Sequence, residues 1–223
     1  MRIILGDFAT ALEEIAVSRT RAARQQYADT ELNLVDLHTQ RAIVLFALGR
    51  HDEALAGLRE DAAVEREGAL TTFTALTYAG ALTNSGRAEE ALVVLNRFEP
   101  QSKSDLAWLA LRRICALAAL NRRDEGRALL PRLESESWQG TLLYEALLCL
   151  DDYDRAASAI VEQLEDPVRR GAALVRLSEW NYAPNPNRGQ RLLQERSFRV
   201  QNRQDVRTAI AKIGRTEPID LIF

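Results

Sequence analysis

Two stretches of the sequence, LFALGRHDEALAGL at residues 45–58 and LTNSGRAEEALVVL at residues 82–95, carry the same residue types at the same offsets. Each has a Leu, then Gly-Arg four residues later, then Glu-Ala-Leu and a closing Leu. The pattern continues as LAALNRRDEGRALL at 117–130 and LLCLDDYDRAASAI at 147–160, and upstream LGDFATAL at 5–12 matches part of it. The chain is therefore built on an internal repeat.

The repeat predicts helical hairpins. Its turn residues follow one another at intervals of 43, 37, 35 and 30, which bracket the period of about 34 of helix-turn-helix repeats. Asn and Asp are the residues that best replace Gly where the backbone turns with positive φ. Apolar residues recur at helical spacing on both sides of each turn, and a small residue early in the second helix permits close helix contact. The expected turn residues are Gly6, Gly49, Gly86, Asn121 and Asp151, and the small residues are Ala11, Ala54, Ala91, Gly126 and Ala156.

The pattern Gly-x-x-x-Glu-Ala, with Leu, Phe or Ile four residues beyond the Ala, resembles the tetratricopeptide repeat (TPR) family over about residues 5–165. The aromatic and Gly of the family's first helix are missing, with His38, Ala42, Ala75 and Ala79 in those places. The resemblance implies an all-α fold, a right-handed superhelical array of antiparallel helical hairpins or TPR-like α-solenoid. It also implies a concave groove, lined by the first helices, that binds peptides.

Three regions are expected: the TPR-like array at 1–180, a loop or linker at 181–190 rich in Pro and Asn, and a C-terminal helical segment with an extended apolar tail at 191–223. Asp166 and Pro167 predict a helix start, with the helix reaching about residue 180. Two further helices should follow, the second closed by Gly214. At the other end, three readings stay open: a first helix has been lost, another chain or domain covers the exposed face, or residues 7–27 form one long capping helix.

The amino-acid composition indicates which class of protein this is. Scarce Gly and Pro, with 27% charged residues of both signs, are typical of a helical protein. No apolar run is long enough to cross a bilayer and no secretory signal is evident, so we expect a cytoplasmic location and no membrane insertion. Arg outnumbers Lys 27 to 2, which indicates a GC-rich, bacterial genome. Cys115 and Cys149 have no partner at metal-ligand spacing, so buried free thiols are expected.

The motifs of catalysis are missing from the sequence. It contains no Gly-rich phosphate loop, HExxH, CxxC or GxSxG motif. His51 occupies a turn position expected to pack, and His38 has no carboxylate partner at local spacing. The acidic pairs, such as those at 89–90 and 151–152, stand at helix starts, where carboxylates favour the helix dipole and solvent. We therefore expect no catalytic residue, no enzyme activity, no cofactor and no metal.

Partner-binding candidates are the polar and aromatic side chains expected on the first-helix groove. Two Trp residues occupy equivalent places in successive repeats, and Trp is enriched at interaction hot spots; the alternative is that both fill the core between repeats. The Lys and Asn cluster by which chaperone-binding TPR members hold a C-terminal carboxylate is missing, so that activity is not expected. The candidates are Gln40, Thr77, Asn84, Trp108, Arg112, Trp138 and Glu145.

Charge is uneven along the chain. Residues 181–223 carry eight basic and four acidic groups, whereas residues 1–180 carry 21 and 28. With few aromatics nearby, the tail is not expected to bind nucleic acid, and its arginines are expected to dock against the acidic array or a partner. Leu221–Phe223 either pack back or bind a partner.

The sequence thus predicts a non-catalytic protein-protein interaction scaffold or adaptor for a protein or peptide, with homo- or hetero-oligomer contact through the N-terminal end. Alternatives are a regulatory module whose basic tail contacts nucleic acid, and a non-catalytic subunit or fragment of a larger enzyme or secretion assembly.

Overall fold

The computed structural model describes residues 7–24, 30–63, 69–100, 102–133, 140–180, 186–216 and 218–219. Over these ranges the protein is all-α, as predicted. The helices are α1 (Phe8–Arg24), α2 (Thr30–Ala47), α3 (His51–Ala62), α4 (Ala69–Asn84), α5 (Ala88–Asn96), α6 (Lys103–Ala119), α7 (Arg123–Arg127), α8 (Gly140–Cys149), α9 (Tyr153–Glu165), α10 (Arg170–Leu177), α11 (Arg188–Gln201) and α12 (Gln204–Ile213), with a short 3-10 turn at Leu130–Arg132. None of these described helices is both long and apolar enough to span a bilayer.

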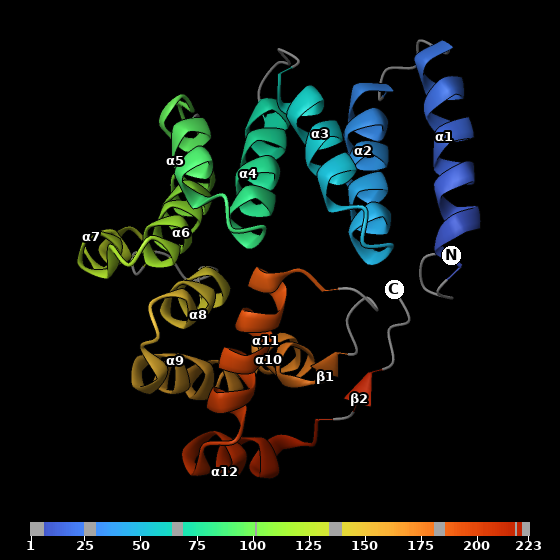
Figure 1. Cartoon of the computed structure of the whole chain (residues 1–223). Helices are drawn as coiled ribbons and strands as arrows, with labels where there is room; N and C mark the ends of the chain where they lie inside the picture. Colours follow the sequence, from blue (N-terminus) through green and yellow to red (C-terminus); the bar gives the residue numbers. More distant parts are fainter. Residues whose placement is uncertain are drawn as a thin grey trace. The chain divides into compact units, whose positions relative to one another are not determined.

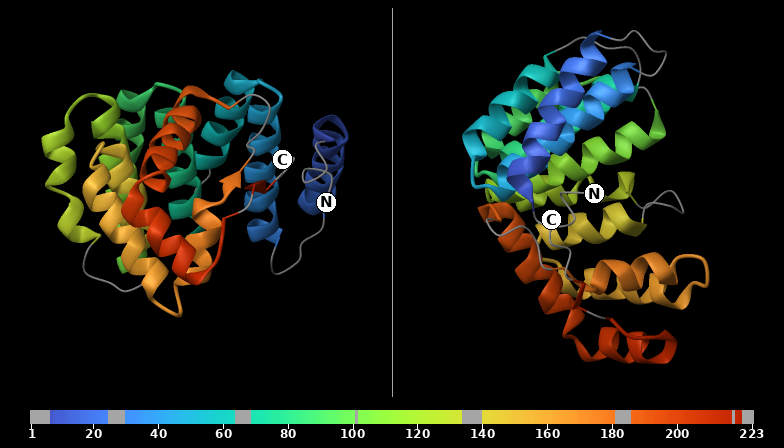
Figure 2. Two further views of the ribbon diagram at one scale, coloured as in Figure 1. Left: turned by 90° about the horizontal axis from the view of Figure 1, so that it is seen from below. Right: turned by 90° about the vertical axis from the view of Figure 1, so that its right-hand side faces the viewer.

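Two compact units make up the chain. Unit 1 comprises Met1–Gln101, Asn181–Arg188 and Leu221–Phe223, and unit 2 comprises Ser102–Trp180 and Gly189–Asp220. In unit 1, helices α1 to α5 pack in sequence (Figures 1 and 2), and α2 also contacts α4. In unit 2, α6 packs on α7 and α8, and α9 packs on α8, α10 and α12 (Figure 1). The expected regions 1–180, 181–190 and 191–223 stay a prediction.

Four helical hairpins confirm the repeat. They are α2–α3 and α4–α5 in unit 1, and α6–α7 and α8–α9 in unit 2. Four of the five predicted turn residues are described, and each has positive φ: 75° at Gly49, 81° at Gly86, 61° at Asn121 and 60° at Asp151. Left-handed backbone favours Gly, with Asn and Asp the usual substitutes, so chemistry explains why these residue types recur. The fifth expected turn residue, Gly6, lies outside the described residues.

Each of these turns closes by the same hydrogen bond. The amide of the residue after the turn residue donates to a carbonyl five residues earlier, which satisfies one of the last carbonyls of the first helix. The four N···O distances are 2.8, 2.8, 2.9 and 3.0 Å, for Arg50 to Leu45, Arg87 to Leu82, Arg122 to Leu117 and Asp152 to Leu147. The same hydrogen bond in all four turns shows that Asn and Asp form the same turn as Gly.

Small residues stand where the helices of a hairpin meet, as predicted. Ala54, Ala91 and Ala156 are completely buried. A Cβ placed on Gly126 would lie 3.0 Å from Leu150 Cδ2. The packing of α7 therefore leaves little room for a side chain at this position.

The N-terminal helix α1 is a single element. The Asp7 side chain accepts a hydrogen bond from the Thr10 amide at 3.3 Å, which caps its first turn. Phe8, Ala11 and Ile15 pack against α2. This agrees with the reading of one long helix at 7–27 up to Arg24; the other two readings of this end remain open.

The helix predicted after Asp166 has other bounds in the structure than the sequence indicated. Asp166 accepts bonds from the Val168 and Arg169 amides as a cap should, but residues 167–169 form a turn and α10 begins only at Arg170. The helix also ends at Leu177 and not near residue 180, because the chain turns extended at Ser178. There β1 (Glu179–Trp180) pairs in parallel with β2 (Pro218–Ile219), which confirms an extended tail over those two residues.

The two helices expected after the linker are present as α11 and α12, and Gly214 follows the last of them. Helix α11 already begins at Arg188, inside the range expected to be a loop. The remaining tail residues, Leu221–Phe223, lie outside the described residues.

Candidate functional site

The candidate groove residues that the structure describes lie on the first helices of the hairpins, at fixed distances before each turn residue. Gln40, Thr77 and Arg112 all stand nine residues before their turn residue. Phe73, Trp108 and Trp138 all stand thirteen before theirs. Residues at one repeat position share one side of the helix, so we call this side the first-helix face. Sequence reasoning noted the two Trp residues but missed Phe73, which the same count would have found.

In unit 1 the first-helix face is built by α2 and α4, which contact each other. Gln40 on α2 and Thr77 and Asn84 on α4 are half-buried. Beside them, Phe73 is 48% exposed and Ile43 is 41% exposed. Two large apolar side chains thus remain open to solvent next to three polar groups, a mixture typical of protein-binding surfaces.

In unit 2 the structure brings three of the predicted residues together. The Arg112 guanidinium carbon lies 5.5 Å from the centroid of the Trp108 ring. Arg112 Nη1 donates to Glu145 Oε1 at 3.3 Å, which joins α6 to α8. Trp108 is partly buried against the core, and the last candidate, Trp138, lies outside the described residues.

Arg112 and Glu145 carry opposite charges on neighbouring helices. The Glu145 carboxylate lies 3.3 Å from Arg112 Nη1, so the charge of Arg112 is partly compensated within the chain. Arg112 Nε is shielded from solvent and donates no hydrogen bond to any residue that the structure describes.

The prediction that Cys115 and Cys149 are free thiols was wrong. Cys115 on α6 and Cys149 on α8 are joined by a disulfide with an S–S distance of 2.08 Å, so they are not free thiols. Spacing along the chain could not reveal this, because the bond joins first helices of successive hairpins that only tertiary packing places side by side. It lies three to four residues beyond the Arg112–Glu145 pair, so two crosslinks hold the same helices.

Asp151 is also more than the solvated turn carboxylate that the sequence indicated. It accepts from Arg123 Nη2 at 2.8 Å, from Arg196 Nη2 at 3.1 Å and from the Tyr153 hydroxyl at 2.8 Å. Partial burial raises the pKa of Asp151, but the Tyr153 hydrogen bond and the two guanidinium charges outweigh it, so the pKa is lowered from 3.8. We call these four residues the Asp151 cluster.

Arginines of the C-terminal segment dock within unit 2, in agreement with the expected electrostatic docking. Besides Arg196 in the Asp151 cluster, Arg203 pairs with Asp154 at 2.6 Å. The Arg199 guanidinium lies 5.7 Å from the centroid of the Tyr153 ring. Three arginines of the basic tail are thus occupied inside the chain, which leaves fewer for nucleic-acid phosphates.

Both histidines are positioned by neighbours. His38 Nδ1 lies 3.1 Å from Asp61 Oδ1, and Asp61 is only 2% exposed. The sequence offered His38 no carboxylate at local spacing, and the structure supplies one from α3, 23 residues later. His51 packs its ring 5.7 Å from that of Phe46, as expected of a packing residue.

Within the described ranges, no group of three or more His, Cys, Asp or Glu side chains is placed to hold a metal ion. No protein-family model matches the chain, and neither a curated protein nor a solved structure matches it.

Proposed function

We propose that this chain is a non-catalytic protein-interaction scaffold that binds an extended peptide segment on the first-helix face. In this proposal the hairpins stack as a TPR-like, right-handed superhelical array, and the TPR resemblance of the repeat supports it. The observation that carries the proposal is the aromatic residue thirteen positions before the turn: Phe73 is half-exposed, and Trp108 is joined to an arginine.

The chemistry of this face favours a peptide with apolar side chains. Phe73 and Ile43 offer open apolar surface in unit 1, and burial of such surface is the main favourable term in association. In unit 2 the partly buried Trp108 ring, with the Arg112 guanidinium beside it, offers an aromatic surface. An extended peptide supplies apolar side chains for such surfaces.

The proposal is tested with peptides selected from a random twelve-residue display library against the intact, oxidised chain. We expect Phe73→Ala to weaken the peptides that unit 1 binds, and Trp108→Ala those that unit 2 binds, by at least about tenfold, the usual effect of truncating a hot-spot residue. The matched control is Val93→Ala, because Val93 is 53% exposed but lies on α5, a second helix. Circular dichroism checks that the variants fold.

Two outcomes contradict the proposal. One is that no peptide is enriched. The other is that the enriched peptides bind the Phe73 and Trp108 variants normally and lose affinity only with Val93→Ala. The alternative in which the basic tail contacts nucleic acid predicts instead a duplex or single-strand affinity that falls steeply with salt.

The expected cytoplasmic location also stays a prediction. The disulfide between Cys115 and Cys149 bears on it, since disulfides persist mainly in oxidising compartments. Trapping thiols by alkylation in intact cells measures the oxidised fraction: a fully reduced pair supports the cytoplasm, and a fully oxidised pair contradicts it.

A further inference from the structure

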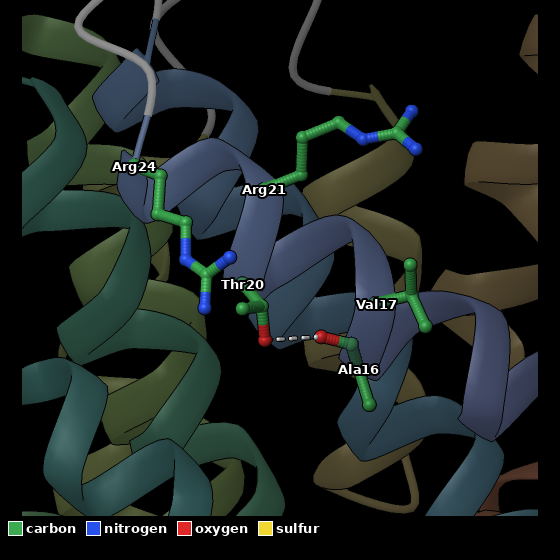
Figure 3. A pocket seen from close by; sticks show the side chains of 5 residues that line it. All are labelled: Ala16, Val17, Thr20, Arg21 and Arg24. Atoms are coloured by element: carbon green, nitrogen blue, oxygen red, sulfur yellow. Dashed lines mark hydrogen bonds between the residues drawn. The ribbon is translucent and has the colours of Figure 1, made fainter.

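The outer side of α1 is a surface that nothing in the described part of the chain covers. One side of the helix packs on α2 through Phe8, Ala11 and Ile15. On the other side, an open depression of about 530 Å³ is lined by Ala16, Val17, Thr20, Arg21 and Arg24 (Figure 3). Val17 is 60% exposed at its centre. We call this side the outer face of α1.

Charge is divided along this face. The acidic groups, Glu13 and Glu14, precede Val17, and Arg21 and Arg24 follow it. All four are exposed. Glu13, Arg21 and Arg24 form no ion pair or hydrogen bond with the rest of the chain as far as the structure describes it. Figure 3 shows the Arg21 and Arg24 guanidinium groups extending away from the helix, on either side of Thr20.

The spacing makes the face complementary to itself. Glu13 and Arg21 lie four residues before and four after Val17, which places all three on one helix stripe. If two copies of α1 align antiparallel about a two-fold axis at Val17, each Glu13 faces the Arg21 of the other copy. A parallel alignment instead sets like charges opposite each other, so the charge pattern selects the antiparallel arrangement.

Side-chain size also permits this contact. Ala16 and Thr20 flank Val17 and are small, so two helix backbones can approach closely across them. The Thr20 hydroxyl already donates to the Ala16 carbonyl at 3.0 Å, so covering it leaves no unpaired donor.

We propose that the outer face of α1 binds the same face of a second copy of this chain, in an antiparallel, two-fold symmetric dimer centred on Val17. Two-fold contacts of identical surfaces are the commonest form of homo-oligomer. A 17-residue helix is about 25 Å long, so the interface is small. The dimer is accordingly weak, concentration-dependent and sensitive to salt. This inference is independent of the first-helix face.

Charge reversal tests the dimer by sedimentation velocity of the full chain over a range from micromolar to millimolar, at low salt. The variants are Glu13→Arg and Arg21→Glu, alone, mixed in equal amounts, and combined in one chain. Each single variant places like charges across its own dimer, so we expect its dissociation constant to rise at least about tenfold. The equimolar mixture pairs opposite charges and should associate within about threefold of wild type, as should the doubly reversed chain.

The control is Glu89→Arg on α5, which reverses an equally exposed carboxylate away from this face and should leave association unchanged. Circular dichroism spectra establish that every variant is folded. A wild-type chain that stays monomeric at every concentration overturns the proposal. Association that survives both single reversals, or singles that dissociate but do not recover on mixing, overturns it as well.

Discussion

Replacing Asp151 by Gly sets two effects of known sign against each other. Gly relieves the positive φ of 60° at this turn, which costs an L-residue roughly 1–2 kcal/mol and somewhat less for Asp. The same change removes the acceptor of the Asp151 cluster. Three donors lose their partner, and one of them, Arg196, has a side chain only 14% exposed.

The magnitude follows from those contacts. A hydrogen bond to a charged group contributes about 1.5–3 kcal/mol in mutational series. The Asp151 side chain is 31% exposed, so solvent screens these bonds and about 1 kcal/mol each is the appropriate discount. The loss of roughly 3 kcal/mol exceeds a turn relief of about 1 kcal/mol. We therefore expect Asp151→Gly to lower the free energy of unfolding by about 2 kcal/mol.

The matched comparison is Asn121→Gly, at the same turn position of the preceding hairpin. Asn121 has a φ of 61°, is exposed, and its side chain accepts one long contact from Arg123 at 3.4 Å. Turn relief dominates there, so this variant should be as stable as wild type or more stable by up to about 1 kcal/mol.

Urea unfolding of the oxidised protein, followed by far-ultraviolet circular dichroism, measures both changes. The reasoning is refuted if Asp151→Gly is as stable as wild type, or if the two Gly variants shift the free energy of unfolding equally. The pH dependence gives an independent check. Because the pKa of Asp151 is lowered in the folded protein, its stabilisation is complete above 3.8 and is lost as pH falls through the depressed value. The gap between wild type and Asp151→Gly should narrow over that acid range.

Two further predictions concern the packing of unit 2. Reducing the Cys115–Cys149 disulfide, or replacing both residues by Ser, should lower the free energy of unfolding by roughly 3–4 kcal/mol. The reason is the chain entropy of the loop that the disulfide closes, which spans 34 residues. Urea curves that coincide with and without reductant would contradict this prediction. Gly126→Val should lower the free energy of unfolding by about 1–3 kcal/mol, because a Cβ at this position lies 3.0 Å from Leu150 Cδ2. Gly171→Val is the control, since nothing lies within 4 Å of a Cβ there. Equal stability of the two variants would argue against close packing at Gly126.

Local sequence determined the hairpins. Gly49, Gly86, Asn121 and Asp151 were identified from their offsets alone, and all four adopt positive φ. This succeeds because a tight turn depends on backbone sterics of one residue, and few residue types tolerate them. The buried small residues, such as Ala91, follow from the same local periodicity.

Tertiary structure decided the contacts between helices distant in the sequence. Three such contacts are Cys115 with Cys149, His38 with Asp61, and the turn residue Asp151 with Arg196 of α11. No spacing rule predicts them, because they depend on how the helices pack. The first-helix face was determined partly by the sequence and partly by the tertiary structure. The sequence identifies its residues by their distance from the turn residue. The exposure of Phe73 and the pairing of Arg112 with Glu145 depend on the packing of neighbouring helices.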